Sequence, residues 1–369
     1  MIGVNAIACV PRLAEAPVGE QAAWATHGGD LARAPSAEEA LSTDLEPAWT
    51  WDAGRAAAGP IAIGDSVVVA VSTDRRIAVL RRDSGQLIWR ARLKGPGASG
   101  PLFEGETVYA ASGDRRGAVH AYGLLTGKRR WSRAVGPVVG PLALGEATVY
   151  AATTAGSVVA LDAERGHVRW QRSFTGPLRS GVTHVGVHLL VASDDSLYLV
   201  RSDDGHVVAS TAADGAPYHP PAITGTLLVA ASPDGIVSGY ALPSLERQWS
   251  LDVEAPVFGS PAIARDTAFV VTLDGHLWRI PLNTPAWARA IDLGYTVRAA
   301  PTPVWDGVLI GTVAGDIVFL RGESVEPVWR ASVDGPIEVA PVVDRGTLFV
   351  IDGRGTIRLW RSATEPREP

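Results

Sequence analysis

The stretch PAIARDTAFVVTLDGHLWRI, residues 261–280, contains the pattern that decides the fold of this chain. Its apolar start meets a turn at Arg265–Asp266, and TAFVVTL then has the β-branched composition of a second strand. Asp274–Gly275, a dipeptide suited to positive φ, predicts a hairpin turn into HLWRIPL, and WARAIDL follows from Trp287. The stretch therefore predicts four short antiparallel strands.

The same pattern recurs about every 40 residues along the chain, and three residue types share this period. They are the prolines that begin apolar stretches, Pro60, Pro101, Pro141, Pro221, Pro261, Pro301 and Pro341; the turn glycines Gly235, Gly275, Gly315 and Gly355; and the tryptophans Trp49, Trp89, Trp131, Trp170, Trp249 and Trp329. The fourth repeat is irregular, with Gly181 in place of the proline and Ala209 in place of the tryptophan. The sixth repeat shifts its tryptophan by two residues, to Trp287. No helical periodicity is sustained after residue 50, which excludes a helical solenoid.

Counting the repeats predicts an all-β fold, an eight-bladed β-propeller of four-stranded antiparallel blades. The eighth repeat lacks a fourth strand of its own, whereas PAWTWDA (47–53) matches PVWRASV (327–333) of the seventh repeat. We therefore expect an N-terminal strand to complete the last blade and close the ring, which removes the exposed sheet edges. The predicted propeller covers residues 46–369, and residues 1–45 form a lead-in.

The repeat consensus is Ala-x-Asp-x-x-x-Gly-x-x-x-Trp, most complete in ALDAERGHVRW (160–170). The glycine permits the hairpin turn. The tryptophan is expected to lie between adjacent blades and to bury roughly 150–250 Å² of mostly apolar surface. We interpret the six periodic tryptophans as structural residues, with ligand stacking as the alternative.

Composition excludes several classes of function. The net charge of −6 argues against nucleic acid or an acidic membrane surface as the main partner. The single cysteine, Cys9, excludes an internal disulfide and a cysteine-based metal site. No stretch approaches the roughly 18 to 20 apolar residues that span a bilayer.

Three motifs are weak candidates for chemistry. GPGASG (95–100) matches a dinucleotide fingerprint but precedes no helix. His184 and His188 have the spacing of a helical zinc site, although Val185–Gly186 between them reads as a turn. The aspartates Asp194, Asp195, Asp203 and Asp204 suit either hairpin turns or calcium. We predict no catalytic residue, no cofactor and no metal site.

The start of the chain leaves two alternatives open. Ala6-Ile7-Ala8-Cys9 resembles the end of a bacterial lipoprotein signal, with Ala6 where leucine is usual. Cys9 would then be the lipidated N-terminus of an exported protein; otherwise the chain is cytoplasmic and Cys9 is incidental. WATHGGDLARAP (24–35), followed by Ser36–Glu39, is expected to drape over the ring or to begin a short helix with a capping box.

From about residue 45 to its end, the chain resembles the PQQ-type propeller repeats of quinoprotein alcohol dehydrogenases. Those enzymes hold pyrroloquinoline quinone and calcium with an inserted acidic and amide ligand set beside a Cys-Cys disulfide. Here the loops are short and there is one cysteine. The resemblance therefore implies the fold without the enzyme chemistry.

An eight-bladed ring of this size, with Cys9 near its start, is most similar to the outer-membrane assembly factor BamB family. That resemblance implies a non-catalytic scaffold at the periplasmic face of the outer membrane, anchored by a lipid, which binds soluble domains of a BamA-like protein and assists β-barrel insertion. It also implies a partner contact at Leu178 and Arg179, in FTGPLRSG. Their register is shifted by about three residues from the family pattern, and APYHPP (216–221) lacks the two acids that the family has there.

The alternatives are an ordinary exposed loop at Leu178–Arg179, a generic exported propeller that binds another protein or ligand, and a PQQ-dependent dehydrogenase.

Overall fold

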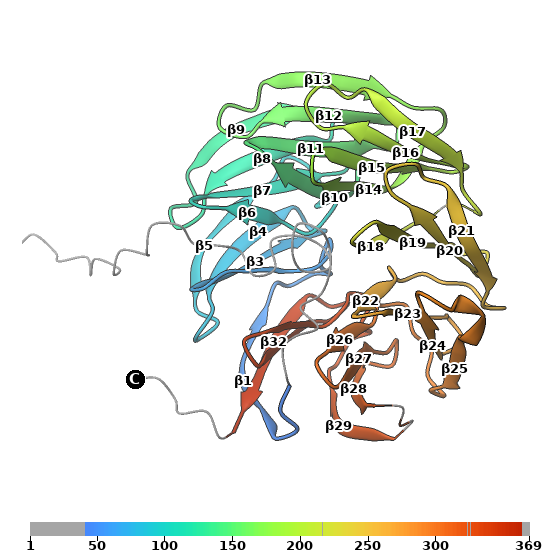
Figure 1. Ribbon diagram of the computed structural model, residues 1–369. Helices are drawn as coiled ribbons and strands as arrows, with labels where there is room; N and C mark the ends of the chain where they lie inside the picture. The colour runs from blue at the N-terminus through green and yellow to red at the C-terminus, as the bar shows by residue number, and fades with distance from the viewer. Residues whose placement is uncertain (1–40, 216, 323, 325, 364–369) are drawn as a thin grey trace, which may run out of the picture.

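The computed structural model describes residues 41–215, 217–322, 324 and 326–363, which form a ring of eight four-stranded blades (Figure 1). In every blade the strands pair antiparallel with their neighbours. Colour runs around the ring from blue to red and brings β32 beside β1 (Figure 1). The predicted eight-bladed, all-β propeller is confirmed.

Each blade runs from an inner strand near the ring axis to an outer strand at the rim. The first four blades are β2 (Ala62–Ile63), β3 (Val67–Ser72), β4 (Arg76–Arg81) and β5 (Leu87–Arg92); β6 (Leu102–Glu104), β7 (Thr107–Ser112), β8 (Ala118–Gly123) and β9 (Arg129–Ala134); β10 (Val138–Gly145), β11 (Thr148–Thr153), β12 (Ser157–Asp162) and β13 (Val168–Ser173); and β14 (Leu178–Val185), β15 (His188–Ser193), β16 (Ser196–Arg201) and β17 (Val207–Ala212).

The remaining blades follow the same plan, with one short 3-10 helix. They are β18 (Ala222–Thr224), β19 (Leu227–Ala231), β20 (Ile236–Ala241) and β21 (Arg247–Asp252); β22 (Ala262–Ala264), β23 (Thr267–Val271), β24 (His276–Pro281), η1 (Pro285–Trp287) and β25 (Arg289–Asp292); β26 (Thr302–Val304), β27 (Gly307–Gly311), β28 (Asp316–Arg321) and β29 (Pro327–Ser332); and β30 (Val342–Asp344), β31 (Thr347–Ile351) and β32 (Thr356–Ser362), completed by β1 (Leu45–Asp52).

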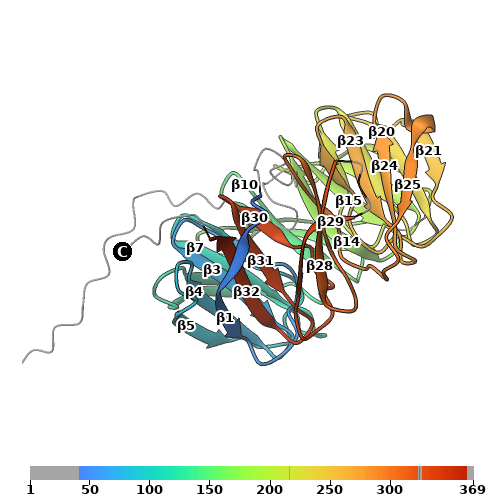
Figure 2. The same cartoon turned by 90° about the horizontal axis from the view of Figure 1, so that it is seen from below.

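The N-terminal strand closes the ring. β1 pairs along its whole length with β32, and Trp49 lies opposite Leu359. The red β32 and blue β1 also lie side by side when the ring is seen from below (Figure 2). Across the seam, the Arg82 guanidinium of blade 1 pairs with Asp344 of blade 8, and both side chains are largely buried. The expected closure by an N-terminal strand is confirmed.

Apolar side chains fill the spaces between blades. Every residue of β3 and β8 is buried, whereas the outer strands alternate between covered and exposed positions. One cluster joins Val69 and Val79 of blade 1 to Phe103 and Tyr122 of blade 2. Each blade therefore covers its neighbour, as the repeat predicted. No helix in the part of the chain that the structure describes is long and apolar enough to cross a membrane.

Two irregular positions have a visible cause. Gly181, which replaces the repeat proline, has φ +81°, and a Cβ there would lie 2.7–2.8 Å from atoms of Pro141 in the preceding blade. Trp287 does not enter the fourth strand of blade 6 as expected, because η1 holds it before β25 begins. Arg289 instead occupies the position of the blade tryptophan, in register with Arg279 of β24.

Candidate functional site

Four of the predicted blade tryptophans dock on the following blade in one way. Each indole lies over the turn between the third and fourth strands of that blade, and its Nε1 donates a hydrogen bond to a backbone carbonyl there. The bonds run from Trp49 to Arg82 (2.9 Å), from Trp89 to Leu124 (2.6 Å), from Trp131 to Ala163 (2.9 Å) and from Trp170 to Ser202 (3.0 Å). We call this contact a tryptophan dock.

The consensus glycine serves the dock as well as the turn. Gly205, in the turn that receives Trp170, has φ +74°, which favours glycine. A Cβ at Gly205 would also lie only 2.8 Å from Cε3 of that indole. The glycine is therefore required for two reasons. The hairpin turn needs its positive φ, as the sequence predicted, and the indole of the neighbouring blade leaves no room for a Cβ.

The other blades lack this arrangement. Trp249 buries its Nε1 without a hydrogen-bond partner, and Trp329 meets Trp360 edge-on with ring centroids 6.3 Å apart. Ala209 replaces the tryptophan of blade 4, and Leu245 replaces the glycine of the turn that would receive it. Leu245 has φ +57° and is fully buried in the cluster that Ala209 packs against.

The ring presents two faces with different connections. We call the end with the first-to-second and third-to-fourth strand turns the turn face. The opposite end, with the second-to-third strand turns and the links between blades, is the connection face. Tryptophan docks lie at the turn face, and the predicted partner contact lies at the connection face.

A periodic polar residue, which was not among the residues predicted from the sequence, supports the connection face. In each blade a buried Ser, Thr or Asp stands at the end of the second strand: Ser72, Ser112, Thr153, Ser193, Ser232, Thr272, Thr312 and Asp352. These side chains bond to backbone across the turn, as in His276 N–H to Thr272 Oγ1 at 3.0 Å and Thr356 N–H to Asp352 Oδ1 at 2.9 Å. Their 40-residue spacing was a readable signal. These hydrogen bonds fix the conformation of the second-to-third strand turns, and the exposed side chains of the same turns form the surface of the connection face.

The predicted contact pair is divided between core and surface. Leu178 is fully buried between blades 3 and 4, whereas Arg179 is exposed. Arg179 Nε donates to Asp194 Oδ1 at 2.7 Å, and this hydrogen bond raises the pKa of the guanidinium. The pair lies in β14 rather than in the expected loop, and strand alternation turns the leucine inward. Arg179 is the member of the pair that a partner can reach.

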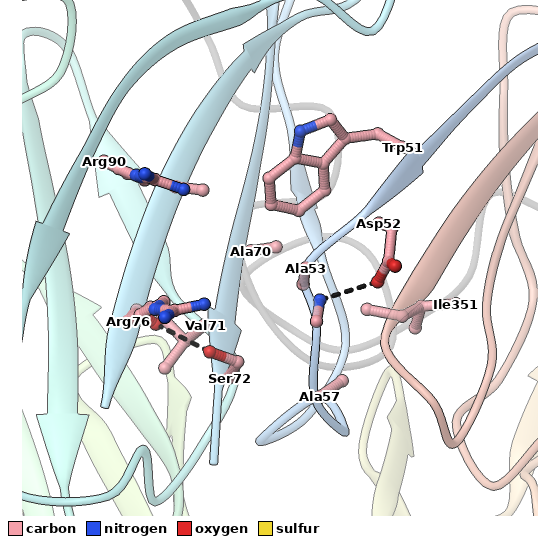
Figure 3. A pocket seen from close by; sticks show the side chains of 12 residues that line it. Trp51, Asp52, Ala53, Ala57, Ala70, Val71, Ser72, Arg76, Arg90 and Ile351 are labelled. Carbon is pink, nitrogen blue, oxygen red and sulfur yellow. Dashed lines mark hydrogen bonds between the residues drawn. The ribbon is translucent and has the colours of Figure 1, made fainter. Parts of the chain in front are cut away.

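A small pocket of about 100 Å³ opens at the seam between blades 8 and 1 (Figure 3). Trp51 and Asp52 border it from β1, and Arg76 and Arg90 border it from blade 1. Asp52 Oδ1 accepts a hydrogen bond from the Gly54 N–H at 2.6 Å, which fixes the turn that leaves β1. The pocket has about the size of a few water molecules and belongs to the ring closure.

The histidines named as a weak zinc candidate belong to separate strands. His184 lies in β14, and His188 is the first residue of β15. A hairpin turn connects the two strands, and Val185 and His188 pair across it. The His184 ring stacks on Tyr150 with centroids 5.9 Å apart, and burial lowers its pKa. A third histidine, His120, is buried between Ser112 and Ser132, and burial lowers its pKa to about 4. Uncharged packing accounts for His184 and His120.

The four aspartates of the fourth repeat lie at opposite ends of β16. Asp194 pairs with Arg179 at the connection face, and Asp195 accepts a bond from Ser193. Asp203 and Asp204 both pair with Arg201 at the turn face. They therefore do not form one calcium site. Within the described ranges no group of three or more His, Cys, Asp or Glu side chains is arranged to hold a metal ion. Cys9 lies outside the described residues.

Comparison with known proteins places the chain in one family. Residues 25–177 and 115–242 match the family model described as outer membrane protein assembly factor BamB. The BamB of Burkholderia pseudomallei (strain K96243) is 25% identical over 86% of this chain and 88% of its own length. The BamB of Yersinia pestis is 23% identical over 63% and 67%.

Solved structures confirm the fold. BamB from Moraxella catarrhalis superposes with a TM-score of 0.76 at 17% identity, over 86% of this chain and 99% of that one. Quinohemoprotein alcohol dehydrogenase from Comamonas testosteroni gives a TM-score of 0.78 at 11% identity, over 94% and 81%. At these identities the likeness concerns architecture alone. The family match spans more than half of the sequence, and the chain belongs to the outer membrane protein assembly factor BamB family.

Proposed function

We propose that this chain is a non-catalytic scaffold that assists the assembly of β-barrel proteins into the outer membrane. The family match, together with 25% identity over most of both chains to a curated assembly factor, carries the proposal. The turns within the blades and the links between them are short, and an assembly role by binding needs only such a surface and no inserted catalytic loop. The likeness to alcohol dehydrogenases is of the fold and does not supply an activity.

We further propose that the connection face contacts a BamA-like protein and that Arg179 belongs to this contact. Arg179 and Asp194 are both about half exposed. An exposed ion pair of this kind adds little to stability, so its charges are available to a partner. The buried turn residue Ser193, which bonds to the Asp195 carboxylate beside Asp194, gives the pair a fixed support.

The test is co-purification of the full chain with the periplasmic domains of the BamA-like protein of the same organism. We expect Arg179→Glu to reduce recovery at least tenfold, because it places two carboxylates side by side. Arg201→Glu is the matched control, since Arg201 forms an equally exposed pair with Asp204 at the turn face. If the wild-type chain fails to co-purify, the proposed function is overturned; if Arg179→Glu still co-purifies fully, only the contact is overturned.

We propose that Cys9 determines where in the cell the protein is held. A lipidated Cys9 would hold the ring at the periplasmic side of the outer membrane. Mass spectrometry of the membrane fraction should find a lipid-modified peptide that starts at Cys9, and Cys9→Ala should release the protein to the soluble periplasmic fraction. Recovery of unmodified Cys9 in the cytoplasm would contradict this location.

A further inference from the structure

The outer edge of blade 4 differs from the outer edges of the other blades. β17 is the last strand of its sheet, so its outer backbone edge meets no further strand of the described chain. Its sequence, VVASTA, contains no charged residue. Every other outer strand contains at least one arginine or aspartate: Arg90 in β5, Arg133 in β9, Arg172 in β13, Asp252 in β21, Asp292 in β25, Arg330 in β29 and Asp52 in β1. Blade 4 is therefore the one blade whose outer strand carries no charge.

Charges on an edge strand normally prevent it from pairing with a strand of another chain. β17 lacks this protection, and its valines and threonine favour extended backbone. None of its six residues is fully buried, and the exposed Val208, Ser210 and Ala212 alternate with half-buried positions. An added strand could therefore reach the backbone edge of β17 and place side chains on both faces of the sheet.

The side chains beside this edge favour large neighbours on one face. Ser210 lies opposite Tyr198 of β16, and the Tyr198 ring packs against Phe174, the residue after β13, with centroids 5.0 Å apart. Both aromatic rings are half-buried. Because Ser210 and Ala212 are small, apolar or aromatic side chains of an added strand would fit over them beside this aromatic pair. The edge therefore suits a strand in which large apolar residues alternate with small or polar ones.

The size of the edge favours a transiently bound polypeptide over a second copy of the chain. Stable protein–protein interfaces bury roughly 1,200–2,000 Å² in total. A pair of six-residue strands supplies only part of such an area, because every second position of β17 is already partly covered. Weak, reversible binding is what a client needs if it is to be passed on.

The edge also lies on the blade that carries the proposed partner contact. Ala212, the last residue of β17, pairs with Ser196, the first residue of β16. The turn before Ser196 contains Asp194, which pairs with Arg179. A segment bound along β17 would therefore end close to the proposed contact with the BamA-like protein.

We propose that the outer edge of β17 binds an extended segment of an unfolded β-barrel protein, which adds antiparallel to the four strands of blade 4. Strands of membrane β-barrels alternate apolar with polar residues, the pattern that suits the two faces beside this edge. The β17 backbone supplies the hydrogen bonds, and Ser210 and Ala212 leave space for the large side chains. The inference rests on the proposed function for the identity of the client, and it adds the site and the chemistry of recognition.

The experiment measures binding of an uncharged peptide amide, Gln-Thr-Val-Thr-Tyr-Thr-Val-Gln with an uncharged dye at its N-terminus, to the full chain by fluorescence anisotropy. The control peptide has the same sequence with N-methylated central amides, which removes the backbone donors and keeps the side chains. We expect the wild-type chain to bind the first peptide alone. Hydrogen exchange of the wild-type chain should locate this peptide, with protection of amides in residues 207–212 and none in residues 168–173 of β13.

Ser210→Arg combined with Ala212→Arg should weaken peptide binding at least tenfold. The fold should be retained, because Arg90 and Arg92 occupy the same register in β5. The matched control is Gln171→Arg with Ser173→Arg, which adds the same charge at the same register of β13 and should bind as wild type. Glutamate at positions 210 and 212 should weaken binding as arginine does, and it replaces the arginine variant if that variant does not fold.

Equal binding of the two peptides would overturn the proposal, as would full binding by the charged β17 variants or protection of a different strand. A wild-type dimer in sedimentation that Ser210→Arg with Ala212→Arg converts to monomer would also overturn it, because a second copy would then hold the edge. The same variant should still co-purify with the BamA-like protein. Failure of the edge site and failure of the proposed function therefore give different results.

Discussion

The two halves of the ring are held together in different ways. Four successive junctions, from blade 8 through blade 4, each carry a tryptophan dock with its hydrogen bond. The four junctions from blade 4 back to blade 8 carry none of these bonds. There Ala209 packs in the cluster of Leu245, Trp249 leaves Nε1 without a partner, a pocket opens, and Trp329 meets Trp360.

This difference teaches that the tryptophan and the receiving glycine act as one unit across the blade boundary. Where the tryptophan is present, a bulkier residue in the turn would strike the indole, as the 2.5 Å distance from a Gly166 Cβ to the Trp131 ring demonstrates. Where the tryptophan is absent, the turn is free to change. Between blades 4 and 5, Leu245 of blade 5 fills the space that a tryptophan of blade 4 would occupy. Between blades 6 and 7 a pocket remains.

The largest effect should come from removing β1, which provides both the ring closure and the first dock. Deletion of residues 45–52 exposes β32, the Trp49 site on blade 1 and the buried Arg82–Asp344 pair. We expect a loss on the scale of the whole stability of a domain, about 5–15 kcal/mol. Thermal unfolding followed by near-ultraviolet circular dichroism measures it, with deletion of residues 364–369 as control. An unchanged melting curve would contradict closure by β1.

The docks themselves should differ between the halves. Trp131→Ala removes a buried indole together with its bond to Ala163, so we expect a loss of about 3–5 kcal/mol in the free energy of unfolding. Trp249→Ala removes a half-buried indole that makes no such bond, so the loss should be smaller. Denaturant titration of the two variants compares them, and equal losses would show that the dock bond and burial do not distinguish the halves.

The pairing of tryptophan with glycine can be tested by transplanting it. Ala209→Trp alone should overpack against Leu245, and Leu245→Gly alone should leave a cavity beside Ala209. The double variant restores the matched pair, so we expect a favourable coupling of up to about 3 kcal/mol in a double-mutant cycle. Additive losses would refute the idea that the two positions form one unit.

The smallest expected effect comes from a pair of glycine substitutions that separates the Cβ–indole contact from the cost of positive φ. Gly205→Ala and Gly186→Ala both place alanine at positive φ, +74° and +58°. A Cβ at Gly205 meets the Trp170 ring, whereas a Cβ at Gly186 meets nothing within 4 Å. We expect Gly205→Ala to cost about 1–2 kcal/mol more than its control, as is usual for mild overpacking. Similar melting temperatures for the two variants would mean that the turn alone requires the glycine.

Much of the fold could be predicted from the sequence because the repeat is visible in single residue types. Prolines, glycines and tryptophans with one period were sufficient to count eight blades and to assign Trp49 to the last one. The buried Ser72 and its counterparts in the other blades carry the same period, and were missed because serine and threonine are common in turns.

The candidate sites were less predictable because they depend on the direction of individual side chains. Leu178 and Arg179 are adjacent in sequence, and strand alternation puts one in the core and the other at the surface. The pocket between blades 6 and 7 is lined by residues of both blades, and it lies where the tryptophan of blade 6 is displaced to η1. No short sequence motif predicts such a pocket.

The sequence by itself determined the number of blades, their strand order and the closing strand, since these follow from a 40-residue period and from β-strand patterning. The tertiary structure alone decided which junctions are docked, where Leu245 fills the space of a tryptophan and where a pocket remains beside Phe269 and Gly322. The physical reason is that a junction joins residues from two repeats, and its packing depends on how both side chains share one volume.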